Sequence, residues 1–440
     1  MFGMEFAGKT GGSLRTHEAS SHVVTPRVGG EKVCEGSTMT VASSDSPSGV
    51  RKIGQGHAKG IQSAHHALTH LDAVRGLAAL AVVLYHLREI FFVPSQEVAR
   101  MSVIIKGIYV LSGLGHQAVM VFFVLSGFFI SSSVLRSVRS GRWSWRKYLV
   151  QRLTRLYTVL LPALCLGAVL DCAGMALFGT HSIYPQRFLH VHDAFPEQSF
   201  ASRTTPLIWV GNLFFLQGIY VPQFGSNNPL WSLSYEFWYY LLFPLVALTV
   251  VGDMPVGRKV LYAATALAVL CFVGPTIALD FLIWLLGAAL CLMRPSSWAG
   301  TRLFGATSFS ALCFFMGAYS VGVIHLPFVP DFLIGLTFAA FMYYLLSVER
   351  RQHSAWYTKI AQTASNVSYT EYLIHYPFLV FLNACVVRTT AKWQPDRQHL
   401  AAAAGLLVCT LLYVAVVWWL TEAKTDKIRA LLSPPAAKTA

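Results

Sequence analysis

Ionisable side chains occur in two stretches of the sequence that are apolar enough to cross a bilayer. The first stretch contains Asp72, Arg75 and His86, and a later one contains Glu236. A charged group in hydrocarbon is costly, so such residues face a protein interior or a wet cavity and mark functional positions by default. At about 100° per residue, the eleven positions from Arg75 to His86 place both on one helix face, about 16 Å apart along the axis. The spacing therefore predicts a polar seam along this helix.

These residue types support proton transfer and acyl chemistry. An imidazole that titrates near neutral pH accepts a proton from a hydroxyl, or attacks a thioester and carries the acyl group itself. We therefore assign His86 as a base or acyl carrier, and Glu236 as the group that orients it or receives the acceptor's proton. The alternatives are that His86 is a buried hydrogen-bonding residue and that Glu236 pairs helices.

The composition is that of a multi-spanning membrane protein. Of 440 residues, 55% are hydrophobic and 12% are charged, and the mean hydropathy is +0.52. The net charge of +14 is not gathered into a basic patch with interleaved aromatic residues, so the sequence indicates no nucleic-acid partner. We interpret it as loop charge that sets topology and contacts membrane lipids. Eight cysteines without a CxxC pair indicate no metal site.

Helices must position these side chains. One short apolar segment, residues 206–220, contains Asn212 and Gln217, and we expect it to be re-entrant or interfacial. The sequence therefore predicts an all-α polytopic membrane protein with about ten transmembrane helices, preceded by a disordered N-terminal tail. The expected spans cover residues 71–92, 117–135, 148–178, 229–251, 259–278, 279–293, 303–324, 331–347, 366–388 and 398–420.

Loop charges orient these spans. The loop over residues 135–155 carries seven basic residues and no acid, which places it and the N-terminus on the cytoplasmic side. If residues 206–220 do not cross, the later basic loops also fall inside. We therefore expect both termini to be cytoplasmic.

Depth along the spans separates the candidate residues. Arg75, Arg152 and Arg155 lie towards the cytoplasmic face, His86 lies beyond mid-bilayer, and Glu236 lies in the outer half of its span. Guanidinium groups make charge-assisted, often bidentate bonds to phosphates, so the inner mouth suits a donor such as acyl-CoA. The alternative is that Arg152 and Arg155 only set topology.

Five segments share their order and spacing with one family. They are LDAVRGLAALAVVLYHL, AVMVFFVLSGFFIS, YLVQRLTRLYTVLLP, NPLWSLSYEFWYYLLFPL and SYTEYLIHYPF. Over roughly residues 68–420 the chain closely resembles the membrane acyltransferase-3 family. That family consists of inner-membrane proteins that move an acyl group, usually acetyl from acetyl-CoA, onto sugar hydroxyls of surface or secreted glycans. The resemblance implies the same reaction and location here.

The resemblance also assigns residues and domains. It implies that Arg75 and His86 are the family's arginine and histidine, that Arg152 and Arg155 are its basic pair, and that Glu236 is the acid of its WSL-x-x-E motif. Acyl-CoA is then a donor substrate, with no bound cofactor, and the acceptor is a glycan or lipid-linked saccharide. We expect a tail over residues 1–66, a transmembrane domain over 67–421 and a cytoplasmic tail over 422–440.

Four further residues are candidates with two interpretations each. Asp72 lies three positions before Arg75, so the two form a phosphate gate or simply pair with each other. Trp231 and Tyr235 stack on a sugar or belong to an interfacial aromatic belt. His375 in YLIHYP contributes to the site or binds carbonyls that the following proline frees.

Two other functional classes compete with an acyltransferase. A transporter or a flippase for a lipid-linked sugar would also bury His, Glu and Arg in many spans. Transporters often repeat their halves, whereas here the ionisable residues concentrate in the first half. The other class is a non-catalytic membrane scaffold, in which His86 would be dispensable.

Overall fold

The computed structural model describes residues 48–184, 195, 198–320, 328–348 and 354–432, with side chains from Thr69 onwards. Two compact units are distinguished, one of residues 4–62 and one that contains residues 63–440. The fold of the unit that contains residues 63–440 begins within the helix Ser48–Phe91.

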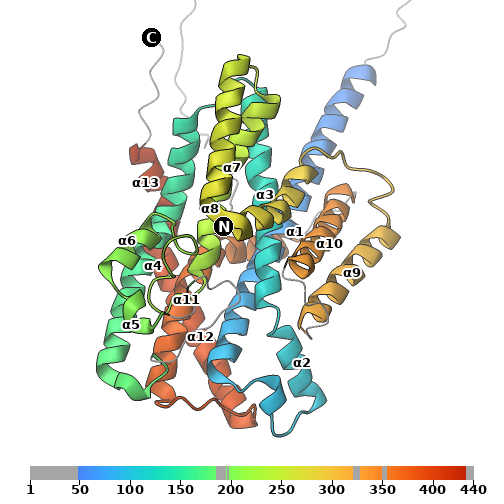
Figure 1. Ribbon diagram of the computed structural model, residues 1–440. Helices are drawn as coiled ribbons and strands as arrows, with labels where there is room; N and C mark the ends of the chain where they lie inside the picture. Colours follow the sequence, from blue (N-terminus) through green and yellow to red (C-terminus); the bar gives the residue numbers. More distant parts are fainter. Residues whose placement is uncertain (1–47, 185–194, 196–197, 321–327, 349–353, 433–440) are drawn as a thin grey trace, which may run out of the picture. The chain divides into compact units, whose positions relative to one another are not determined.

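Helices make up the regular structure of the described residues, among which there is no β-strand, so the α-helical class is confirmed (Figure 1). Three short 3₁₀ turns lie at Ser95–Glu97, Gly179–His181 and Glu422–Lys424. The α-helices are α1 (Ser48–Phe91), α2 (Val103–Leu111), α3 (Gly115–Arg139), α4 (Trp145–Phe178), α5 (Phe200–Arg203), α6 (Pro206–Leu213), α7 (Leu230–Val251), α8 (Val256–Leu290), α9 (Arg302–Ser320), α10 (Val329–Ser347), α11 (Ala355–Val386), α12 (Arg397–Leu420) and α13 (Thr425–Leu432).

The expected count of about ten spans is not confirmed. Within the described residues, seven helical segments are long and apolar enough to cross a membrane. The two expected spans at 259–278 and 279–293 belong to one element, α8, which bends where Gly274 takes φ 81° ahead of Pro275. Glycine tolerates that left-handed backbone, and proline removes a helical hydrogen bond, so the pair makes a kink rather than a loop between two spans.

Both expected tails contain helix. Residues 48–66 form the beginning of α1, whereas residues 1–47 lie outside the described part of the chain. At the other end, a 3₁₀ turn and α13 occupy residues 422–432, and residues 433–440 are outside the description. The domain boundaries that we expected at residues 66 and 422 are therefore not places where helix gives way to coil.

Helices α3 and α8 cross at very short range through two glycines. A Cβ on Gly127 would lie 1.9 Å from the carbonyl oxygen of Trp284, and one on Gly287 would lie 1.9 Å from that of Val124. Small residues at a helix crossing allow such an approach of backbones. The crossing explains the glycine of FFVLSGFF structurally, and it brings α8 beside the α3 face that also packs on α7 and α10.

The short apolar segment after α5 does not reach across a bilayer. Helix α6 has eight residues, which is about 12 Å of helix against a hydrocarbon core of about 30 Å. Asn212 holds the chain that follows, since its Nδ2 donates to the carbonyl of Pro222 at 2.9 Å and its Oδ1 accepts from the N–H of Phe224 at 3.1 Å. This length agrees with the expected re-entrant or interfacial segment.

Candidate active site

Two histidines from opposite ends of the sequence form the centre of the site. His86 Nδ1 lies 2.9 Å from His375 Nε2, and His375 Nδ1 lies 2.8 Å from the carbonyl oxygen of Glu371. A carbonyl only accepts, so in a neutral pair His375 carries its proton on Nδ1 and accepts on Nε2. His86 then donates from Nδ1, which leaves the lone pair of this imidazole on Nε2.

Aromatic rings hold the His86 ring in place. The His375 ring is stacked on it at 5.1 Å, and the Tyr376 ring meets it edge-on at 4.8 Å. His86 is 8% exposed and His375 is fully buried. The pair is therefore enclosed by protein side chains, with His375 and Tyr376 on two sides of the His86 ring.

The proline of YLIHYP leaves His375 available for this contact. Pro377 has no N–H, which frees the carbonyl one turn earlier, at Leu373. Asn227 Nδ2 donates to that carbonyl at 2.9 Å. The interpretation in which His375 itself binds the freed carbonyl is therefore wrong, because Asn227 does so and His375 bonds to Glu371 and His86.

Glu236 is turned away from the histidine pair. Its Oε1 accepts from Tyr240 at 2.6 Å and from Ser126 at 3.2 Å, and Trp284 donates to Ser126 at 3.0 Å. We expected Glu236 to contact His86. Instead, His86 of α1 contacts His375 of α11, whereas Glu236 of α7 contacts Ser126 of α3. His375 takes the orienting place that we expected for Glu236.

A very small cavity lies beside Glu236. It measures about 10 Å³, which is room for one water molecule, and it is lined by Ser232, Tyr372 and Glu236 together with the apolar side chains of Val119, Phe122 and Phe123. The Tyr372 hydroxyl lies 2.7 Å from that of Ser232, and the Tyr372 ring lies 6.3 Å from the His375 ring. Tyr372 therefore contacts both the cavity beside Glu236 and the histidine pair.

Arg75 lies deep in a second polar cluster. Its Nη1 donates to Ser365 Oγ at 2.7 Å, and Ser365 in turn donates to Asp72 Oδ1 at 2.9 Å. Arg75 Nη1 is 3.7 Å from the same Asp72 oxygen, and the guanidinium carbon lies 5.0 Å from the centre of the Phe129 ring. The expected Asp72–Arg75 pair is present, with a serine from α11 between its members.

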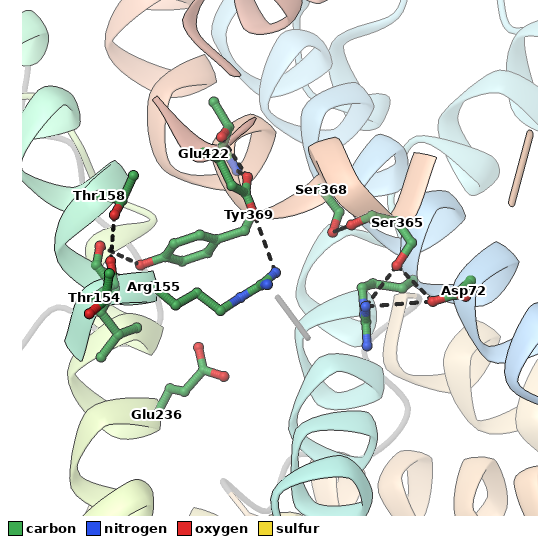
Figure 2. A network of polar contacts seen from close by, with 12 residues as sticks. Asp72, Thr154, Arg155, Thr158, Glu236, Ser365, Ser368, Tyr369 and Glu422 are labelled. Atoms are coloured by element: carbon green, nitrogen blue, oxygen red, sulfur yellow. Dashed lines mark hydrogen bonds and ion pairs between the residues drawn. The ribbon is translucent and has the colours of Figure 1, made fainter. Parts of the chain in front are cut away.

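Arg155 makes an ion pair that the sequence did not reveal. Its Nη2 lies 3.2 Å from Glu422 Oε1, while Glu422 Oε2 accepts from the Thr370 hydroxyl at 2.7 Å. Figure 2 shows the Glu236 carboxylate pointing towards Arg155 from the other side. Arg155 is therefore more than a topology charge. Its partner was missed because Glu422 falls just after the last apolar span, in the expected tail.

Arg152 lies one turn earlier on α4, and its neighbour Gln151 lines a basic cavity. Its guanidinium carbon is 5.5 Å from the centre of the Tyr148 ring. The cavity, of about 490 Å³, is lined by Arg146, Lys147 and Arg429 among others, from the first turn of α4 and from α13. Sequence reasoning counted Arg146 and Lys147 only as topology charges, although they shape this cavity.

Trp231 and Tyr235 surround a second histidine. Both are buried, which does not fit an interfacial belt. The Trp231 ring lies 6.3 Å from the His116 ring at 22°, and Tyr235 packs on Trp231 at 5.1 Å. His116 Nε2 lies 2.8 Å from Asp331 Oδ1. Sequence reasoning missed this pair, because each member begins a helix and resembles an ordinary helix-terminal polar residue.

Comparisons with known proteins agree with this polytopic architecture. Residues 68–422 match the family described as Acyltransferase domain. The chain is 31% identical over 214 residues to Acyltransferase MdmB of Streptomyces mycarofaciens, a match that covers 46% of this chain and 45% of that protein. It is 26% identical over 213 residues to Putative peptidoglycan O-acetyltransferase YrhL of Bacillus subtilis (strain 168), covering 47% and 28%. The matched part is thus less than half the length of each relative. No solved structure matches.

Proposed function

The chain belongs to the acyltransferase family that matches residues 68–422, and from that membership we propose a transmembrane O-acyltransferase. It takes an acyl group, acetyl in our proposal, from acyl-CoA on the cytoplasmic side and places it on a hydroxyl of a glycan or lipid-linked saccharide on the outer side. We further propose that the protein resides in the inner (plasma) membrane with both termini in the cytoplasm.

The His86–His375 hydrogen bond is the observation that carries this proposal. It directs the lone pair of His86 to Nε2, the nitrogen remote from His375. As base, Nε2 takes the acceptor's hydroxyl proton while the C–O bond forms and the C–S bond of the thioester breaks. The proton then passes to the departing thiolate. As acyl carrier, Nε2 attacks the thioester first, so that an N–C bond forms, the C–S bond breaks and CoA leaves as the thiolate. The acceptor hydroxyl then attacks the acyl group, the N–C bond breaks, and the freed Nε2 takes the hydroxyl proton and passes it to the thiolate.

The arginines support a donor that enters from the α4 side. The basic cavity beside Arg146 and Lys147 offers charge to the nucleotide phosphates of CoA. Arg152 lies about 8 Å further along α4. Arg75 and Arg155 lie deeper. Each is beside a carboxylate, Asp72 or Glu422, whose negative charge compensates the buried guanidinium. We propose that Asp72 positions Arg75 in this way.

A purified-protein assay tests the donor and acceptor halves separately. In lipid nanodiscs, release of CoA from acetyl-CoA is followed with and without envelope glycans, and the glycans are weighed by mass spectrometry. We expect glycan-dependent CoA release and a mass gain of one acetyl group. A wild-type protein that releases no CoA contradicts the enzyme, and glycan or lipid-linked sugar that moves across the bilayer without acylation favours the flippase.

Arg152→Ala sharpens the donor assignment in the same assay. Loss of one charge-assisted phosphate contact removes roughly 1.5–3 kcal/mol of binding, so we expect the KM for acetyl-CoA to rise about tenfold or more. Arg258→Ala, an exposed basic residue near the start of α8, is the control for loss of positive charge. If the KM for acetyl-CoA is unchanged in Arg152→Ala, this arginine does not bind the donor and serves only to set topology.

A further inference from the structure

A further polar cluster, distinct from that of Arg75, Ser365 and Asp72, lies near the proposed reaction centre and has no part in the mechanism above. We call it the His116 cluster: His116 and Gln117 of α3, Asp280 of α8 and Asp331 of α10, with the rings of Trp231 and Tyr319. The His116 ring is nearly parallel to Tyr319, at 5.0 Å and 13°, and to Trp231, at 6.3 Å and 22°. Asp280 lies within electrostatic reach of both Asp331 and His116. The beginnings of α3, α7 and α10 thus converge with the part of α8 that follows its kink.

Two buried acceptor atoms in this cluster have no hydrogen-bond partner within the described residues. They are Asp280 Oδ2 and Gln117 Oε1, on side chains that are 4% and 1% exposed. The Gln117 amide is held by its nitrogen, which donates to Ser320 Oγ at 3.0 Å. A buried acceptor that stays unpaired destabilises the fold, so this site is suited to a ligand that brings donors.

The chemistry of the cluster selects the class of ligand. Two carboxyl groups repel an anion, and the described residues contain no group of three or more side chains suited to a metal ion. Flat ring faces beside carboxylate and amide oxygens suit a neutral ring that carries several hydroxyls. We propose that the His116 cluster binds the sugar of the acceptor, with Asp280 and Gln117 accepting hydrogen bonds from its hydroxyls.

One layer of side chains connects this cluster to His86. The Tyr85 ring lies 5.1 Å from the His86 ring. A Cβ on Gly115 would lie 2.4 Å from Tyr85 Cβ, so Tyr85 packs directly on the backbone that carries His116. A sugar held at the cluster therefore lies close to the imidazole that takes its proton. This inference rests on the proposed function, since it names where that reaction holds its acceptor.

Asp280→Asn and Gln117→Leu test the cluster from two helices. The probe is the unacylated glycan fraction from envelopes of cells that lack this protein. For the wild type we expect these glycans to raise the unfolding midpoint and to speed CoA release. In each variant we expect the midpoint shift to disappear and the KM for glycan to rise about tenfold, with acetyl-CoA hydrolysis in the absence of glycan unchanged. Asp396→Asn, which removes an exposed carboxylate at the start of α12, is the control.

Each result decides between the two proposals. Variants that keep the midpoint shift and the wild-type KM overturn the cluster as sugar site, as do variants that lose hydrolysis and transfer equally. A wild type that ignores the glycans in both measurements overturns it too. If glycans stabilise the wild type but receive no acyl group, the sugar site stands and the acyltransferase reaction fails. The unfolding midpoint without glycan shows whether each variant folds, and the conservative Asp280→Asn keeps the side-chain shape.

Discussion

His86 and His116 each have one ring nitrogen that contacts a side chain of another helix, and the two histidines differ in what that partner is. His86 donates to His375, a neutral ring that is itself held by a backbone carbonyl. His116 faces the carboxylate of Asp331 through Nε2. The lone pair therefore lies on Nε2 in His86 and on Nδ1 in His116 when both rings are neutral.

The partners also separate the roles that we propose for the two histidines. His86 contacts a second imidazole that is itself held by a backbone carbonyl. His116 instead lies against the carboxyl group of Asp331. In our proposal His86 transfers the proton and the His116 cluster holds the sugar, although helix packing places both rings.

The largest effect is expected for His86, the residue that we propose as base or acyl carrier. His86→Ala should abolish acyl transfer and leave insertion and folding intact, a loss of about 1000-fold or more, because the proposed general base or nucleophilic catalysis acts through this ring. Mass spectrometry of glycans from cells with the variant measures it. Wild-type acylation in that variant would remove His86 from the mechanism.

His375 tests the fixed tautomer rather than the base itself. His375→Ala should lower kcat about 100-fold with little change in either KM, since His86 loses the acceptor for its Nδ1–H. His375→Gln keeps an amide oxygen near the position of Nε2 and should recover part of the rate. The pH profile of kcat should move in the alanine variant. Equal activity of the two variants would mean that His375 fills space only.

Glu236→Gln tests whether the negative charge of Glu236 contributes to turnover. The amide keeps an oxygen for Tyr240 and Ser126 and loses the charge that points towards Arg155. We expect a loss of about tenfold in turnover with normal expression, because a charge in a buried polar region contributes electrostatically without a direct bond. The measurement is CoA release at saturating acetyl-CoA. Near wild-type turnover would reassign Glu236 to helix packing.

Asp331→Asn should give the smallest effect and sharpen the contrast. Asparagine still accepts from His116 Nε2 but carries no negative charge, so we expect the KM for glycan to rise about threefold to fivefold, as for one hydrogen bond weakened from charged to neutral. Hydrolysis of acetyl-CoA without glycan serves as the internal control. A loss of that hydrolysis would give both histidines the same role.

Much of the architecture was predictable because its signals are local. Apolar runs predict helices wherever they occur, and the eleven-residue spacing puts Arg75 and His86 on one face of a helix that the structure confirms. In the segment 206–220, the helix α6 has eight residues, which is too short to span a bilayer, as we expected for this segment. The number of spans differs from the expectation, in part because α8 is one kinked helix, interrupted at Gly274, where two spans, 259–278 and 279–293, were expected.

The sequence by itself determined which side chains are costly to bury and along which helix face they lie, because both follow from residue type and helical period. Only the tertiary structure decided their partners. His375 rather than Glu236 meets His86 across 289 positions of sequence, and Glu422 meets Arg155 across 267. Such choices depend on how each helix is rotated about its own axis when it packs, and that rotation is set by contacts summed over several helices rather than by any one segment.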